Sequence, residues 1–393
     1  MKQNYTKTVH ACFIGYIVQA IVNNFVPLLF ITLQTSYSIS LSHITLLVTL
    51  NFGLQLLVDL LSAGFIDKIG YRASAVAAHV LAAAGLISLT VLPEVFSDPF
   101  IGLVTAVMIY AAGGGLLEVL ISPIVVACPT GNKEKAMSIL HSFYCWGQVG
   151  VVLFSTLFFS FAGIGHWKIL ALLWALIPVF NGIMFMKVPI APLVSEENGG
   201  LSFGELMRSK AFWLLMLFMV CAGASEQSVS QWASAFAERG LGISKTMGDL
   251  AGPMLFAVMM GVSRVFYGKR GEKINLKRFM LYSSILCMVS YLVISLSPVP
   301  VLGLIGCGLC GLSVGILWPG TFSMAALTIK GGGTAMFAFL ALAGDLGCSA
   351  GPTLVGSVSS GFHNNLRSGI LAAIVFPVIL LIGLLPRKKK LHT

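Results

Sequence analysis

Charged residues are scarce in this sequence. They make up 10% of its 393 residues, whereas about a quarter of a typical soluble domain is charged. Hydrophobic residues reach 57%, which is more apolar surface than a soluble core could hide. The excess must face lipid, so the composition excludes a water-soluble protein and predicts an integral membrane protein.

Motifs of several other protein classes are also missing. The chain has no H-E-x-x-H zinc motif and no nucleotide-binding P-loop. Its loops are short, without the filter-like loop of a channel or the large extension of a receptor. We therefore expect neither an enzyme nor an ATP-driven pump, and a carrier coupled to an ion gradient is the leading hypothesis.

The eight cysteines do not indicate metal or redox chemistry. All lie in or at the ends of apolar runs. Cys307 and Cys310 form a C-x-x-C, but within a glycine-rich run and without a second pair or nearby histidines. Small apolar packing residues are the better interpretation. The sequence predicts no metal site and no cofactor.

Long apolar runs dominate the chain. About 20 apolar residues in a helix cross the hydrocarbon core of a bilayer, and twelve runs reach that length. Polar or turn-rich breaks separate them. The fold class we predict is an all-α membrane protein with twelve transmembrane helices. The predicted spans are 8–33, 43–65, 72–94, 99–127, 135–163, 166–188, 211–238, 249–268, 276–297, 300–329, 334–360 and 368–386.

The basic residues predict the orientation. Loops on the cytoplasmic side of a membrane carry an excess of lysine and arginine, and an even number of spans puts both termini on one side. With both termini cytoplasmic, the opposite face keeps only Lys168, Arg239, Lys245 and Arg367. The same bias explains the net charge of +10 without nucleic-acid binding. We predict a multi-pass protein of the cell membrane, surrounded by lipid. The residues assigned to the cytoplasmic side are Lys2, Lys7, Lys68, Arg72, Lys133, Lys135, Lys187, Arg208, Lys210, Lys269, Arg270, Lys273, Lys277, Arg278, Lys330, Arg387, Lys388, Lys389 and Lys390.

A polar break at 189–210 divides the chain into two halves of six spans, 1–188 and 211–393. The halves are weakly similar at an offset of about 200 residues, as in transporters built from internal repeats. Gly115-Leu-Leu-Glu118 aligns with Gly315-Ile-Leu-Trp318. We expect two six-helix bundles joined by a cytoplasmic linker, with the site at mid-membrane between them.

A loop motif gives the first specific resemblance. Residues 64–72 read Gly-Phe-Ile-Asp-Lys-Ile-Gly-Tyr-Arg, similar to the G-x-x-x-D-R/K-x-G-x-R signature of the major facilitator superfamily, with Ala63 in place of the first glycine. Residues 261–270 look like the same loop in the second half. The resemblance implies the major facilitator fold over the whole chain and a role in conformational gating for this loop. The implied gating residues are Asp67, Lys68, Gly70, Arg72 and Arg264.

Within that superfamily the chain is most similar to the fucose–proton symporter branch. Residues 113–118, Gly-Gly-Gly-Leu-Leu-Glu, followed by Ser122-Pro123, resemble its G-x-x-x-L-E-x-x-x-N-P motif, and the first span carries Asn23-Asn24. Three positions depart from the pattern. Pro27 replaces an acidic residue, Ser122 replaces an asparagine, and Tyr144 aligns roughly with a polar position of the fifth span. The resemblance therefore implies a functional role for Glu118, but it does not imply specificity for a sugar.

The drug–proton antiporter branch fits less well, because its arginine motif on the fourth span is missing. Gly347-x-x-x-Gly351-Pro352 resembles an antiporter motif, but it lies on the eleventh span. Close packing of small residues explains it equally well.

Three carboxyl groups fall near the middle of predicted spans: Glu118, Glu226 and Asp345. An acid inside the membrane is costly, so each is expected to have a use. Burial disfavours the charged form, so these groups could load and release protons, and we assign them to proton coupling. For Asp345 a structural role is an equal alternative.

For the other ionisable residues in the spans, the sequence does not favour one specific role. Asp59 could be a gate partner or form a structural hydrogen bond. Arg264 is expected to snorkel or form an ion pair rather than contact substrate. His79 and His141 could relay protons, but buried packing histidines are commoner, so neither is assigned a role.

The predicted substrate contacts combine amide and aromatic side chains. Amides offer donors and acceptors to hydroxyl groups, and aromatic rings offer flat apolar faces. For each tryptophan an interfacial anchor is the alternative, most of all for Trp167, Trp213 and Trp232. The set is Asn23, Asn24, Tyr144, Trp146, Gln148, Gln227, Gln231, Trp232 and Trp318.

Together these features predict a secondary transporter that moves a small organic solute, a sugar or another uncharged metabolite, by proton-coupled symport. The spans offer acids and amides but no central pair of basic residues for an anion. The alternative is a proton-coupled efflux antiporter for drugs or lipophilic cations. A monomer suffices for this fold.

Overall fold

The structure is a computed structural model that describes residues 5–129, 133–191, 201, 203–270, 274–330 and 333–385. These ranges are almost entirely helical and contain no strand. They include 12 segments long and apolar enough to cross a membrane, which confirms the predicted number of spans. Residues 192–200 and 202 of the predicted linker lie outside the described residues, as do the predicted basic residues Lys2, Lys273 and 387–390.

Several spans are built from more than one helical segment. The helices of the first six spans are α1 (Thr6–Asn24), α2 (Phe30–Tyr37), α3 (Leu41–Ile69), α4 (Tyr71–Val95), α5 (Pro99–Ala127), α6 (Lys133–Ala162) and α7 (Trp167–Lys187). A short helix, α8 (Phe203–Arg208), precedes the second set. The remaining helices are α9 (Lys210–Ser230), α10 (Ala233–Ala235), α11 (Lys245–Asp249), α12 (Leu255–Arg270), α13 (Leu276–Leu296), α14 (Pro300–Val314), α15 (Leu317–Thr328), α16 (Gly333–Gly361), α17 (Leu366–Ala372) and α18 (Val375–Leu384).

Helix starts follow local capping chemistry. Ser40 accepts a hydrogen bond from the backbone N–H of His43 and caps α3, and Asn275 caps α13 by accepting from Arg278. These side chains satisfy N–H groups that a helix start leaves without partners. The turn between α3 and α4 needs Gly70, whose φ of 89° favours glycine.

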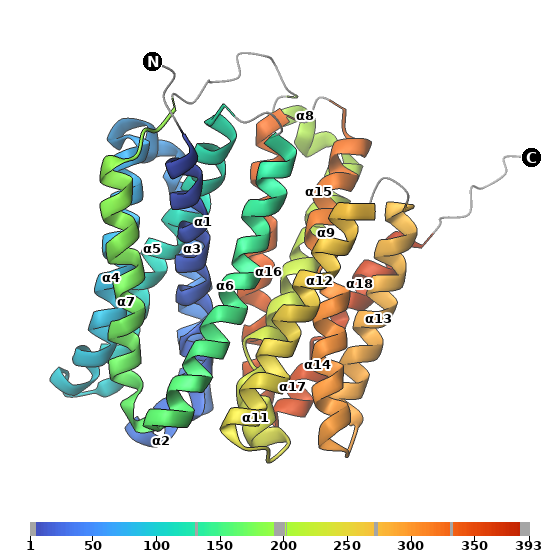
Figure 1. Cartoon of the computed structure of the whole chain (residues 1–393). Coiled ribbons are helices and arrows are strands. Elements are labelled where there is room, and N and C mark those ends of the chain that lie inside the picture. Colours follow the sequence, from blue (N-terminus) through green and yellow to red (C-terminus); the bar gives the residue numbers. More distant parts are fainter. Residues whose placement is uncertain are drawn as a thin grey trace, which may run out of the picture.

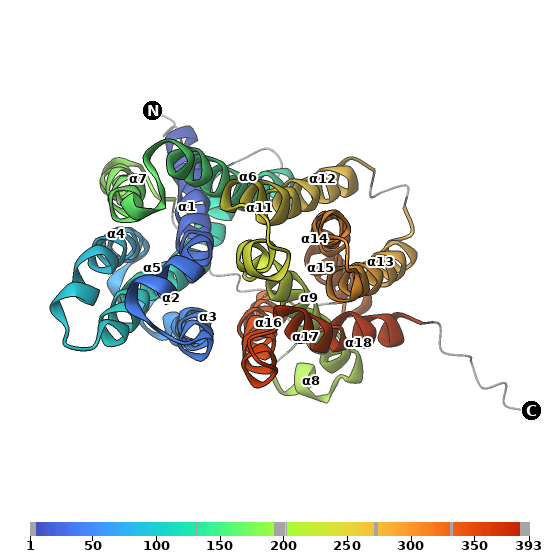
Figure 2. The ribbon, with the colours of Figure 1, turned by 90° about the horizontal axis from the view of Figure 1, so that it is seen from below.

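Two bundles of helices lie side by side (Figures 1 and 2). Helices α1–α7 form the N-terminal bundle and α9–α18 form the C-terminal bundle. Seen along the helix axes in Figure 2, α3 faces α16 on one edge of the contact, and α6 faces α11 and α12 on the other. The chain crosses an even number of times, so α1 begins and α18 ends on one side. We call it the terminal side.

Hydrogen bonds join the bundles from mid-membrane to the side away from the termini. The hydroxyl groups of Thr49 on α3 and Thr353 on α16 form a hydrogen bond of 2.6 Å. Arg239 donates to Gln34 over 2.6 Å, and Phe30 of α2 packs on Trp232. All of these contacts lie in the half of the membrane away from the termini, so the bundles are closed on that side.

Small residues allow the closest helix packing. A methyl group at Gly347 of α16 would overlap the carbonyl oxygen of Val220 on α9, and one at Gly351 would meet the oxygen of Ala224. Contact between two helix backbones requires residues without a bulky side chain. The Gly347-x-x-x-Gly351 pattern is therefore a packing contact inside the C-terminal bundle.

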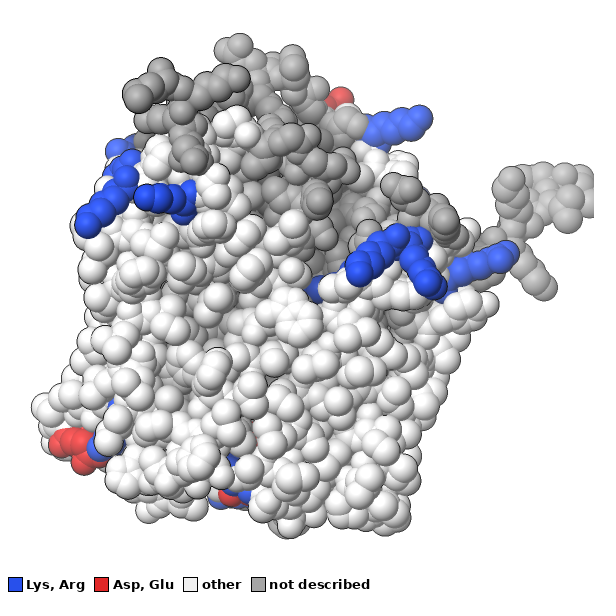
Figure 3. Space-filling model, in the orientation of Figure 1, with Lys and Arg blue, Asp and Glu red and all other residues white. Residues whose placement is uncertain are grey.

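Charged side chains occupy the two ends of the molecule. On the face drawn in Figure 3, lysine and arginine side chains lie along the edge near the termini, fewer charges lie along the other edge, and the broad band between them has almost none. That band matches the hydrocarbon layer of a bilayer. The protein is a multi-pass membrane protein with 12 spans.

Candidate functional site

A cavity of about 110 Å³ lies between the two bundles, large enough for several water molecules. Four helices of each bundle contribute to its wall. His141 is exposed and lies toward the terminal side of α6, so the cavity opens in that direction. The residues that line it are Tyr16, Gln19, Asn23, Phe52, Gln55, Glu118, His141, Tyr144, Glu226, Gln227, Arg264, Trp318, Asp345 and Cys348.

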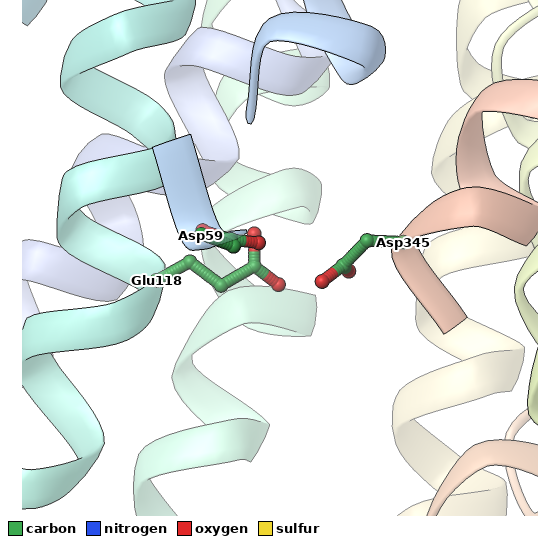
Figure 4. Close-up of side chains that lie close together, drawn as sticks. All are labelled: Asp59, Glu118 and Asp345. Atoms are coloured by element: carbon green, nitrogen blue, oxygen red, sulfur yellow. The ribbon is translucent and has the colours of Figure 1, made fainter. Parts of the chain in front are cut away.

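Three carboxyl groups meet at this cavity. Asp59 of α3, Glu118 of α5 and Asp345 of α16 each place one oxygen so that all three atoms lie within 4.8 Å of one another. Figure 4 shows Asp345 reaching from the C-terminal bundle toward the other two. At an effective dielectric constant of about 20, each pair of negative charges at this distance repels by roughly 3–4 kcal/mol. The cluster therefore calls for protons or a cation.

Amide side chains extend from the cluster along the N-terminal bundle. Gln19 Nε2 donates to Glu118 Oε2 over 3.1 Å and to Gln55 Oε1 over 3.0 Å. Gln55 Nε2 in turn donates to Asn23 Oδ1 over 2.9 Å. Gln19 and Asn23 are four residues apart on α1, so they lie on one helix face. The result is a continuous hydrogen-bonded path from the acid cluster to Asn23.

The path crosses to the C-terminal bundle at a break in the first span. Pro27 has no N–H, so the carbonyl oxygen of Asn23, four residues earlier, lacks its usual helical donor. Gln231 Nε2 donates to this oxygen over 3.1 Å and to Gln227 Oε1 over 3.0 Å. Gln227 Nε2 donates to Glu226 Oε1 over 3.3 Å. The amides thus link the carboxyl groups of both bundles.

Glu226 forms an ion pair with Arg264, whose Nη2 atom lies 3.2 Å from Glu226 Oε2. The ion pair expected for Arg264 is present, but it lies on the central cavity. The sequence predicts no central pair of basic residues, and this single basic residue, Arg264, lines the cavity. A long side chain carries the guanidinium of Arg264 toward the centre. Its Nε atom is buried without a hydrogen-bond partner.

The predicted substrate residues fall into two groups. Asn23, Tyr144, Gln227 and Trp318 line the cavity. Asn24, beside them, donates to the hydroxyl of Tyr144 over 3.4 Å. The structure brings these five polar and aromatic side chains to one place.

The other members lie outside the cavity wall, within the described part of the chain. Gln148 donates to Ser230 over 2.9 Å and so joins the bundles. Trp232 is fully buried and donates to the carbonyl of Pro352, which rules out an interfacial anchor. Trp146 is 45% exposed, and its ring lies beside Gly261 of α12. Gln231 donates hydrogen bonds to two residues of the cavity wall, to the backbone carbonyl of Asn23 and to the side chain of Gln227.

The predicted gating loop lies on the terminal side. Arg72 donates to the carbonyl oxygens of Phe185 and Met186 over 2.8 and 2.9 Å. These oxygens belong to the last turn of α7, where a cation is favourable. Arg72 therefore joins the start of α4 to the end of α7 within the N-terminal bundle. Lys68 is exposed, and the side chain of Asp67 lies outside the described residues.

Sequence reasoning missed Tyr16, Gln19 and Gln55, which line the cavity. It left His141, also in the wall, without an assigned role, and it considered Asp59 only as a gate partner or a structural hydrogen-bonding group, whereas Asp59 belongs to the acid cluster. The sequence contains a pattern that could have identified the polar face of α3. Asn51, Gln55 and Asp59 recur every four residues in an apolar span, and this spacing puts them on one helix face.

Two G-x-S-x-G sequences, 311–315 and 347–351, match a hydrolase motif. Both lie in membrane helices rather than at a strand-to-helix turn. Ser313 donates to the carbonyl of Cys310 over 2.6 Å. Neither segment has the geometry of a nucleophile elbow.

The sequence of residues 12–352 matches the family model of the Major Facilitator Superfamily. None of the curated protein sequences compared with this chain matches it significantly.

Solved structures share the fold at low sequence identity. The fucose:proton symporter FucP of E. coli is 16% identical with a TM-score of 0.67, over 97% of this chain and 98% of that chain. A bacterial homologue of the human lysosomal transporter Spinster, in an inward-facing and unoccupied conformation, is 15% identical with a TM-score of 0.77, over 98% and 97%. A D-xylose–proton symporter is 14% identical with a TM-score of 0.75, over 96% of each chain.

Proposed function

Since the chain belongs to the Major Facilitator Superfamily, we propose that it is a secondary active transporter that carries a small uncharged organic solute, such as a sugar, together with protons. One observation carries the proposal: a cavity of about 110 Å³ between the bundles is lined by amides, aromatic rings and carboxyl groups. Amides and rings suit hydroxylated solutes. Two of the structural neighbours are sugar–proton symporters.

Alternating access provides the transport step. The bundles are held together on the side away from the termini, by pairs such as Thr49–Thr353 and Gln34–Arg239. The exposed His141 marks an opening on the terminal side. With the termini in the cytoplasm of a cell, as the basic residues favour, this is an inward-facing state of a cell-membrane protein. The neighbour described as inward-facing also superposes well on the chain.

Proton coupling is assigned to Glu118 and Asp345, with Glu226 as a second site. Glu118 and Asp345 come from different bundles and approach one another at the cavity. A proton on this pair lowers the repulsion between the bundles, so protonation changes the balance between open and closed states. Glu226 already has Arg264 as a partner, so solute that binds Arg264 could release Glu226 for protonation.

The test is solute uptake into proteoliposomes under an imposed pH gradient. A thermal-shift screen of the purified protein against sugars, polyols, amino acids, carboxylates and lipophilic cations first identifies a ligand, because binding raises the apparent stability. We expect uptake above the concentration gradient, lost in Glu118→Gln. Glu94→Gln, an exposed carboxyl paired with Lys168, is the matched control and should retain uptake.

Two outcomes would contradict the proposal. Retained proton-driven accumulation in both Glu118→Gln and Glu226→Gln would remove the coupling assignment. Stabilisation by lipophilic cations alone, with efflux in place of uptake, would favour the antiporter alternative, for which the acid cluster is the supporting feature.

A further inference from the structure

The acid cluster has the dimensions of a metal-binding site. Asp59, Glu118 and Asp345 present one oxygen each within 4.8 Å of one another. Hard cations bind oxygen ligands at about 2.3–2.6 Å. Three oxygens within 4.8 Å of one another lie no more than about 2.8 Å from a common point, so one ion at that point could reach all three after a small shift of the side chains. The side chains converge from α3, α5 and α16 (Figure 4).

Basic side chains do not neutralise the two cavity-lining members of the cluster. Basic side chains pair with other acids of the described residues, in Lys168–Glu94, Lys245–Asp249 and Arg264–Glu226. Neither Glu118 nor Asp345 takes part in one of these ion pairs. Buried charges are normally paired or coordinate a metal, so these two carboxyl groups need a proton or a cation.

A second observation concerns Gln19, whose side chain is buried (3% exposed). Its Nε2 atom is held at Glu118 Oε2 over 3.1 Å, which fixes the amide beside the cluster. Its Oε1 atom has no hydrogen-bond partner, although buried amide oxygens are nearly always satisfied. An amide oxygen is a ligand that hard cations accept. A cation at the cluster would give this oxygen a partner.

We propose that Asp59, Glu118, Asp345 and the amide oxygen of Gln19 form a binding site for a hard metal cation of the size of Na⁺ or Ca²⁺. Three carboxylates and a neutral oxygen supply the oxygen-only ligand set that such ions prefer. This site departs from the sequence, which predicts no metal site. The cation and protons are alternative occupants of the same carboxyl groups.

The position of the site gives the ion a mechanical role, and this part rests on the proposed transport function. Asp345 belongs to the C-terminal bundle, whereas Gln19, Asp59 and Glu118 belong to the N-terminal bundle. An ion held by all four ties the bundles together at mid-membrane, and its departure leaves like charges that repel. Occupancy is thereby linked to the movement of the bundles, as required of a coupling ion.

The test measures the thermal unfolding of the purified full-length protein in detergent with NaCl, with CaCl₂, or with choline chloride at matched ionic strength. We expect NaCl or CaCl₂, but not choline chloride, to raise the unfolding temperature with concentration, because a bound ion stabilises the folded state. The effective salt identifies the ion. Asp345→Asn and Glu118→Gln should abolish the rise, and Glu94→Gln on the surface should preserve it.

Gln19→Met keeps all three carboxyl groups and replaces the amide, including its donor to Glu118, with a thioether that is a poor ligand for hard cations. It should weaken ion affinity about tenfold or more, the usual loss on removing one partner of a metal site, measured by equilibrium binding of radioactive ²²Na⁺ or ⁴⁵Ca²⁺. It decides the matter if the acid variants fail to fold. Equal unfolding temperatures in all three salts, or an ion effect that persists in Asp345→Asn, would overturn the site. Uptake driven by a pH gradient without added metal tests the transport function separately.

Discussion

The side-chain amide of Gln231 donates to the backbone carbonyl of Asn23 over 3.1 Å, across the boundary between the two bundles. This oxygen is available because Pro27 supplies no N–H to the first span. A helix break in one bundle is thus satisfied by a side chain of the other. The contact joins the amide path that leads from Glu118 to Glu226.

Replacing Gln231 with leucine should lower the stability of the closed arrangement. The change leaves Asn23 O and Gln227 Oε1 without their donor, at about 1–3 kcal/mol. We expect a lower unfolding temperature in detergent. Thr105→Val is the control, because the exposed Thr105 hydroxyl donates only within its own helix. Equal losses in both variants would mean that the inter-bundle bond adds nothing.

Removing Arg239 should favour opening on the side away from the termini. Its hydrogen bond to Gln34 joins the bundles over 2.6 Å, and bonds to charged groups contribute about 1.5–3 kcal/mol. Arg239→Met should therefore raise the open population about tenfold or more. Hydrogen–deuterium exchange should increase in α2 and around residue 239.

Lys168→Met is the matched control for that experiment. Lys168 lies on the same side, but its partner Glu94 belongs to the same bundle. Exchange in α2 should stay unchanged. An increase of the same size in both variants would assign the effect to lost surface charge.

The Glu226–Arg264 pair should respond differently to single and double substitution. Glu226→Leu leaves the guanidinium of Arg264 in the membrane without its carboxylate, which costs about 3–5 kcal/mol for a buried pair. The double variant with Arg264→Met removes both charges and should recover most of that loss. Unfolding temperatures of the four proteins complete a double-mutant cycle. Additive losses would show that the two residues act independently.

Two glycine substitutions should have opposite outcomes. Gly347→Ala places a methyl group against the backbone of Val220, and overpacking costs about 1–3 kcal/mol or more. Gly53→Ala on α3 meets nothing within 4 Å, and alanine stabilises a helix interior by about 0.5–1 kcal/mol. The yield of folded protein and its unfolding temperature distinguish them. A tolerated Gly347→Ala would contradict the close contact of α9 and α16.

The sequence by itself determined the twelve spans and their approximate ends, because crossing a bilayer requires long apolar helices whatever their neighbours are. It also singled out Glu118, Glu226 and Asp345, since acids are conspicuous in apolar runs. It could not determine that Asp59 joins Glu118 and Asp345, or that Arg264 reaches the centre. Those facts depend on how each helix is rotated and shifted against partners far away in the chain. Only tertiary packing decides that, within a bundle through contacts such as Gly347 on Val220 and between the bundles through contacts such as Gln231 on Asn23.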